Sequence, residues 1–115
     1  MEKYMSLNQI LIDTVPVEEK KIVNRSISID GLSMTKLRDI LIKIGKIQRE
    51  FLKERVYVAV IPGGFFKKNY AVVALQLFDK EMIIATYADE GIVKQHTCEE
   101  AINELRKNIQ QFIRE

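Results

Sequence analysis

The second half of the chain constrains the fold most strongly, because it contains three long runs of residues that favour β-strands. Residues 56–61 are apolar on both faces, mostly β-branched, and two further apolar runs cover residues 70–78 and 82–87. Runs that are apolar on both faces are typical of strands buried within a sheet. Asp79 and Lys80 are the polar interruption between the last two runs, which predicts a tight hairpin. We therefore expect an antiparallel sheet.

Two helices are expected, one before and one after these strands in the sequence. Between Leu37 and Leu52, apolar residues recur three and four positions apart, which predicts a long helix with one apolar face. Gly45 lies inside this pattern and is expected either to relieve a close packing contact or to mark a bend. Further along, Thr97 and Glu100 have the spacing of a capping box, which predicts that a C-terminal helix begins there.

The first third of the chain is expected to add two shorter strands. Apolar residues are grouped at positions 10–12, and Ile27 and Ile29 alternate with polar residues. Ser33 or Thr35 then offers a side-chain oxygen that would cap the long helix.

These elements predict one α+β domain over residues 1–115. An antiparallel meander sheet of about five to six strands, the last at residues 92–95, would carry one long central helix and one C-terminal helix, in the order β-β-α-β-β-β-(β)-α. This order resembles that of profilin-like domains, including the longin and roadblock groups. The resemblance lies in architecture and not in a sequence motif, so it implies the layout and carries little about function.

Composition argues against several classes of protein. The formal net charge of the 115 residues is only +2, far from the strongly basic balance of most duplex-binding domains. Cys98 is the single cysteine and has no intramolecular disulfide partner, so we expect a reducing, cytoplasmic location. One cysteine and one histidine leave a metal site dependent on scattered carboxylates, so neither a metal nor a cofactor is expected. The apolar runs are too short for a membrane-spanning helix, and no membrane partner is expected.

Two parts of the chain carry side chains suited to a partner. A loop with two glycines, aromatic rings and lysines joins two of the strands, and one isoleucine falls on the polar side of the long helix. The candidate interaction residues are Ile42, Phe65, Phe66, Lys67, Lys68 and Tyr70. The long helix also has a basic face, formed by Lys36, Lys43, Lys46, Arg49 and Lys53. The competing interpretations are a loop that tucks one ring into the core and a solvated helix face.

Three functions are compatible with these residues. The leading hypothesis is a non-catalytic interaction or regulatory module that self-associates or binds a protein, because no nucleophile, base and oxyanion donor can be assembled. The second is nucleic-acid binding through the basic helix face and the loop from Phe65 to Tyr70. The third is a thiol-dependent enzyme at Cys98, a thiol at a helix start near His96.

Overall fold

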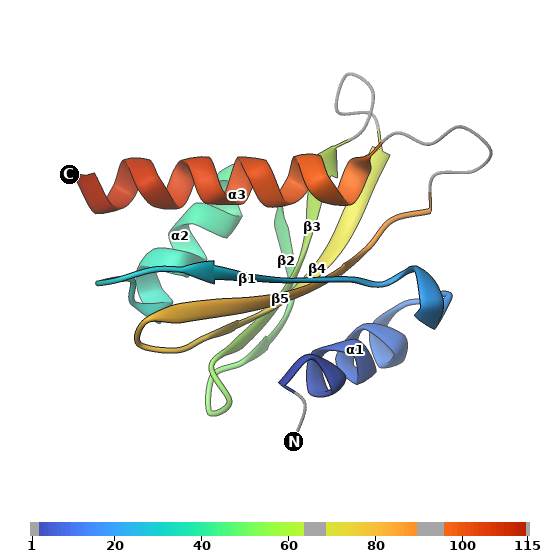
Figure 1. Ribbon diagram of the computed structural model, residues 1–115. Helices are drawn as coiled ribbons and strands as arrows, with labels where there is room; N and C mark the ends of the chain where they lie inside the picture. Colours follow the sequence, from blue (N-terminus) through green and yellow to red (C-terminus); the bar gives the residue numbers. More distant parts are fainter. Residues whose placement is uncertain (1–2, 64–68, 90–95, 115) are drawn as a thin grey trace.

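The computed structural model describes residues 3–63, 69–89 and 96–114, which form one antiparallel sheet with helices on both of its faces (Figure 1). This arrangement confirms the predicted α+β class. The elements are α1 (Lys3–Thr14), the 3₁₀ turn η1 (Glu19–Lys21), β1 (Val23–Ser28), α2 (Met34–Ile44), β2 (Lys46–Phe51), β3 (Val56–Gly63), β4 (Asn69–Leu77), β5 (Glu81–Tyr87) and α3 (Thr97–Arg114).

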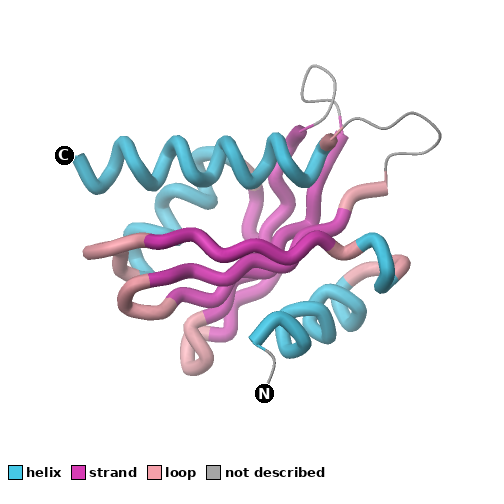
Figure 2. Tube along the Cα trace, viewed as in Figure 1, coloured by secondary structure: helices cyan, strands magenta, loops and turns pink. Residues whose placement is uncertain are grey.

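The five strands lie in the spatial order β1-β5-β4-β3-β2, and every neighbouring pair is antiparallel. β4 is thus the middle strand, while β1 and β2 form the two edges (Figure 2). The predicted hairpin between β4 and β5 is confirmed, and the Phe78 amide donates to the Glu81 carbonyl at 2.8 Å to close it. The predicted strand at residues 92–95 lies outside the described residues.

One face of the sheet packs against α2 and α3. Leu41 of α2 and Leu105 of α3 are fully buried there against Tyr57, Ala59 and other side chains of the interior strands. Side chains alternate between faces along a strand, so the intervening residues of β3 point to the other face. There they meet α1, which lies on the side of the sheet opposite α3 (Figure 1).

The prediction of a strand at residues 10–12 is wrong, because these residues belong to α1. Leu7 and Leu11, four positions apart and therefore on one side of the helix, are fully buried against Val58 and Ile83 of the sheet. The short apolar group at 10–12 does not by itself reveal this spacing. The helix is favoured because the sheet offers an apolar face on which Leu7 and Leu11 are buried.

The prediction of one long helix through Leu52 is also wrong. α2 ends at Ile44, and Gly45 leads directly into the strand β2. β2 has an irregularity between Ile47 and Arg49, at which the strand gains a residue relative to β3. This bulge lets Ile47 and Phe51 pack against opposite faces of the sheet, although their spacing of four imitates one side of a helix.

The predicted helix starts are found in part. Ser33 caps α2, its hydroxyl accepting from the Lys36 amide at 3.1 Å. A helix does begin at Thr97, but the Glu100 amide donates to the His96 carbonyl at 3.0 Å. His96 therefore occupies the capping position, one residue before the predicted one.

Candidate functional site

Three large apolar side chains are well exposed among the described residues: two lie near the ends of the edge strand β2, and the third lies on the middle strand β4. Ile42, in the last turn of α2, is 52% exposed, and Leu52, the first residue after β2, is 62% exposed. Tyr70 of β4 is 60% exposed and lines a groove together with Lys46 and Gln48 of β2. Exposed apolar groups beside the edge of a sheet are typical of an interaction surface.

The groove has a volume of about 390 Å³ and lies where α2, β2, β3 and β4 come together. Pro62 and Tyr70 are direct partners in the register of β3 and β4, and Lys46 is the partner of Val60. These residues share the face that α1 covers farther along the same strands, so the groove occupies the part of that face beyond the helix. The lining residues are Lys43, Ile44, Gly45, Lys46, Gln48, Val60, Pro62 and Tyr70.

The structure describes two of the six predicted interaction residues, and their role as binding residues stays a prediction. Ile42 is exposed as expected, and Tyr70 is exposed and lines the groove. The other four members, Phe65, Phe66, Lys67 and Lys68, lie outside the described residues, so their role stays a prediction.

The predicted basic helix face is wrong, because three of its five members are not on a helix. Lys46 and Arg49 belong to β2, and Lys53 lies in the turn after it. Lys36, on α2, lies over the Phe112 ring of α3 at 4.6 Å from its centroid, whereas Lys43 lines the groove with Lys46. The five cations are therefore distributed over several surfaces.

Arg49 also has its own local partners. Its guanidinium donates to the Thr14 hydroxyl at 3.1 Å and lies 4.6 Å from the centre of the Phe51 ring. These contacts tie the end of α1 to β2 and hold the Arg49 guanidinium beside Thr14 and Phe51.

Sequence reasoning missed Leu52, Val60 and Pro62. Leu52 fitted the apolar side of the predicted helix, so it was expected to be buried. Val60 belonged to the run 56–61, which was expected to be buried on both faces, and Pro62 directly follows that run. Pro62 was the available signal, because a proline inside a strand is typical of its end or of an edge.

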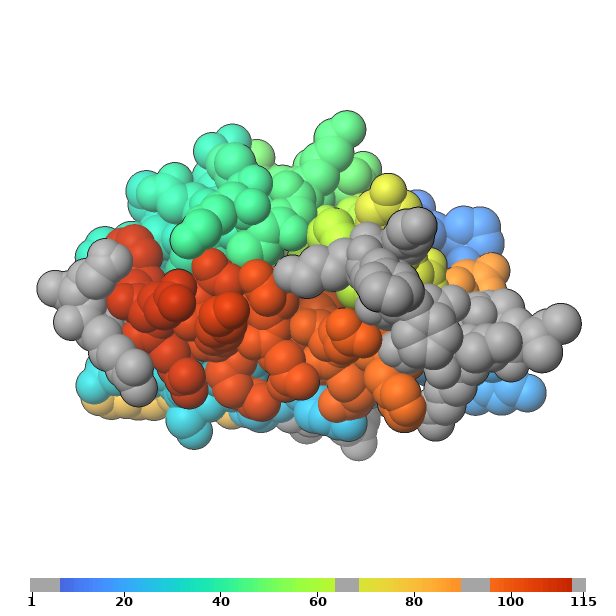
Figure 3. Space-filling model, turned by 90° about the horizontal axis from the view of Figure 1, so that it is seen from above, coloured from blue at the N-terminus to red at the C-terminus, as the bar shows by residue number. Residues whose placement is uncertain are grey.

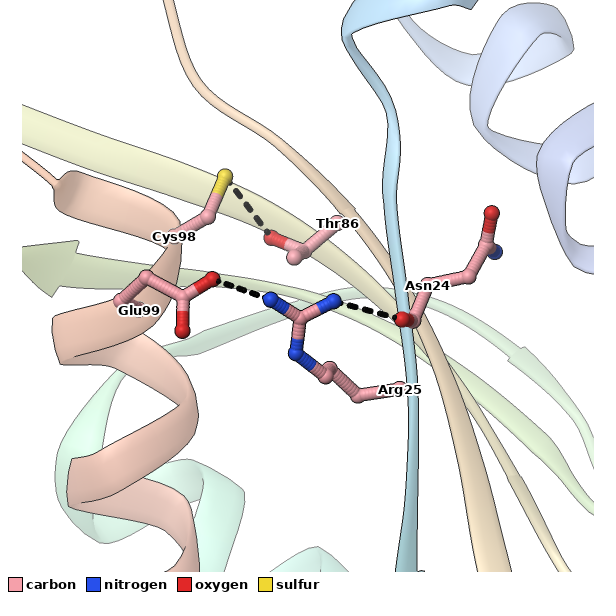
Figure 4. Close-up of polar contacts among 5 residues, drawn as sticks. All are labelled: Asn24, Arg25, Thr86, Cys98 and Glu99. Atoms are coloured by element: carbon pink, nitrogen blue, oxygen red, sulfur yellow. Dashed lines mark hydrogen bonds and ion pairs between the residues drawn. The ribbon is translucent and has the colours of Figure 1, made fainter.

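The third candidate, Cys98, lies half-buried in the first turn of α3 (Figure 4). The Thr86 hydroxyl donates to its sulfur at 3.6 Å, and Thr86 is itself fully buried. Beside it, the Arg25 guanidinium donates to the Glu99 carboxylate at 2.8 Å and joins β1 to α3. His96 is exposed and has a φ of 55°, in the left-handed region, at the helix start. The contact with Thr86 joins α3 to β5, and Cys98 packs against the core on that side of the sheet.

Comparison with known proteins gives no indication of function, so the proposal below rests on the geometry of the structure. No known protein family matches the sequence, and comparison with curated proteins and with solved structures found no match. Among the helices of the described residues, none is long and apolar enough to cross a membrane. Over the same residues, no group of three or more His, Cys, Asp or Glu side chains is placed to hold a metal ion.

Proposed function

We propose that the chain is a non-catalytic interaction module whose copies associate through the surface around β2. We call this the edge surface and define it by the strand β2 (Lys46–Phe51) with Ile42 and Leu52 at its two ends. The observation that supports it most directly is an exposed apolar side chain near each end of a strand that, among the described residues, has one neighbour in the sheet.

An edge strand carries backbone groups that no strand of the same sheet satisfies, so it is the natural place for another chain to add. Over residues 3–63, 69–89 and 96–114, β2 pairs with β3 on one side and has no strand on the other. Its bulge and its charged residues discourage indiscriminate edge pairing, which favours a specific contact over aggregation.

The ion pair between Arg38 and Glu50 indicates that Ile42 lies on the same side of the molecule as β2. The Arg38 guanidinium of α2 lies 3.1 Å from the Glu50 carboxylate of β2. Ile42 follows Arg38 by four residues, about one helical turn, and so extends from the same side of α2. The apolar side chain of the helix and the edge strand therefore form neighbouring parts of one surface. In the view of Figure 3, α2 and β2 (teal to green) form the part of the surface beside α3.

Light scattering at two protein concentrations tests the proposal. The parent chain should show a larger mass at the higher concentration, and the double variant Ile42→Ser/Leu52→Ser should remain monomeric. Because both side chains are exposed, each of the two substitutions should lower folding stability by less than about 0.5 kcal/mol. Tyr70→Ser is the matched control: it removes an exposed apolar group from the groove and should leave association unchanged.

Salt concentration separates this proposal from nucleic-acid binding. Contact between apolar surfaces persists as salt rises, whereas a complex that depends on phosphate neutralisation weakens steeply. A parent chain that stays monomeric at both concentrations, or that assembles only when an oligonucleotide is added at low salt, contradicts self-association.

A further inference from the structure

The groove carries a second inference, which rests on side chains other than Ile42 and Leu52, the two whose exposure supports self-association. Its floor is apolar: Val60 and Pro62 of β3 are only half-buried, and Tyr70 projects beside them from the middle strand of the sheet. A residue of a middle strand is ordinarily covered on both faces, yet Tyr70 is 60% exposed because α1 lies over a different part of that face.

An exposed tyrosine beside a proline is a good anchor for a partner. Its ring offers a large apolar contact that loses little conformational entropy, and its hydroxyl stays available for a hydrogen bond. Tyrosine is among the residues that contribute most to binding energy at protein interfaces.

The sides of the groove are basic. Lys43 and Lys46 line it, whereas no aspartate or glutamate does among the described residues. Several other cations have a carboxylate partner within the chain, as Arg25 has in Glu99 and Arg38 in Glu50. Over residues 3–63, 69–89 and 96–114, neither Lys43 nor Lys46 has such an ion pair. The groove thus pairs an apolar floor with two cations whose charge complement is missing.

We propose that this groove binds a segment of a partner protein that presents an apolar side chain next to a carboxylate. The apolar side chain would pack on Val60, Pro62 and Tyr70, and the carboxylate would pair with Lys43 or Lys46. Charge complementarity of this kind confers specificity on an otherwise apolar contact. A nucleic acid fits the groove less well, since two lysines neutralise little of a phosphate backbone and the other members of the predicted basic face lie elsewhere.

Two synthetic hexapeptides, acetylated and amidated at their ends, test the proposal. One has the sequence Gly-Glu-Leu-Phe-Glu-Gly, and the other has lysine in place of both glutamates. In NMR titrations of the labelled protein at low salt, the acidic peptide should shift the backbone amides of Lys46, Val60 and Tyr70 in a saturable way. The basic peptide should bind at least tenfold more weakly.

Charge reversal provides the decisive variant. Lys43→Glu/Lys46→Glu should weaken the acidic peptide at least tenfold and make the basic peptide the better ligand. The matched control is Lys20→Glu/Lys107→Glu, which changes net charge by the same amount at two exposed lysines outside the groove and should leave both affinities within twofold. Tyr70→Ser should weaken the acidic peptide about tenfold, with the fold checked by its amide spectrum.

Several outcomes overturn the proposal. These are the absence of saturable shifts at the groove with the acidic peptide, equal affinity for the two peptides, or tighter binding of an oligothymidylate at the same amides. A loss of self-association in Tyr70→Ser, which changes no residue of the edge surface, would show that a second copy fills the groove. Failure of the edge surface is distinguishable, because Ile42→Ser/Leu52→Ser should abolish association and leave the peptide titrations unchanged.

Discussion

The backbone of Gly45 lies so close to that of Val60 that a Cβ at position 45 would overlap the Val60 carbonyl oxygen. Such a Cβ would also lie only 3.3 Å from the Cα of Ile61. The contact occurs where α2 ends and β2 begins, so the absence of a side chain at one residue allows the chain to pass from the helix into the sheet.

Gly45→Ala should therefore destabilise the protein, although alanine is the better helix former. Overpacking against backbone atoms that have little freedom to move costs about 1–3 kcal/mol. Chemical denaturation measures the change, and Lys46→Ala, at the next and exposed position, should change stability by less than about 0.5 kcal/mol. A gain in stability for Gly45→Ala would mean that α2 continues past this point.

The apolar residues of α2 should rank by burial. Leu41 is fully buried, Ile44 half-buried and Ile42 exposed. Leu41→Ala should cost about 2–5 kcal/mol, Ile44→Ala less than that, and Ile42→Ala or Lys43→Ala less than about 0.5 kcal/mol. Urea denaturation midpoints give the ranking, and an Ile42→Ala variant as unstable as Leu41→Ala would contradict the assigned helix orientation.

Thr97 should stabilise the start of α3 through Asn69. The Thr97 side chain is fully buried, and its hydroxyl accepts from the Asn69 side-chain amide at 3.1 Å. Thr97→Val keeps the shape and removes this acceptor, at a cost of about 0.5–1.5 kcal/mol. A double-mutant cycle with Asn69→Ala isolates the interaction, and strictly additive changes would show that the two side chains are not coupled.

Tyr57 should make stability depend on alkaline pH. Its hydroxyl donates to the Met34 carbonyl at 3.1 Å, and burial, assisted by the Glu50 carboxylate, raises the pKa of Tyr57 above its usual value of 10.0. A pKa that folding raises gives a stabilisation that is complete below pH 10 and is lost as pH rises through the raised value.

Tyr57→Phe should cost about 0.5–1.5 kcal/mol at pH 8, because the hydrogen bond is lost. The difference between parent and variant should shrink above pH 10, where only the parent must release this buried proton. Urea denaturation at several pH values measures both effects, and a constant difference across that range would contradict the role of Tyr57. The other tyrosines and the lysines are common to both proteins and cancel in the comparison.

Where the local pattern and the tertiary environment agreed, the sequence alone sufficed. Residues 56–61 and 82–87 are apolar on both faces, and they form interior strands with helices on each side. Ala101, Leu105 and Ile109 recur four positions apart in the sequence, and they form the buried side of α3 against the sheet. In these segments, local preference and burial favour the same structure.

Only the tertiary structure decided the identity of α1 and β2. At residues 46–51 the spacing of apolar side chains suited a helix. A bulged strand forms instead, because it pairs with the backbone groups of β3 and because Gly45 lies close to Val60. The groove shows the same limit, because it joins residues 43–46 and 48 to residues 60, 62 and 70, which are distant in the chain. A periodic pattern reports which side of a local element is apolar. Which strand pairs with which, and which part of a sheet face a helix leaves uncovered, depends on contacts between distant residues.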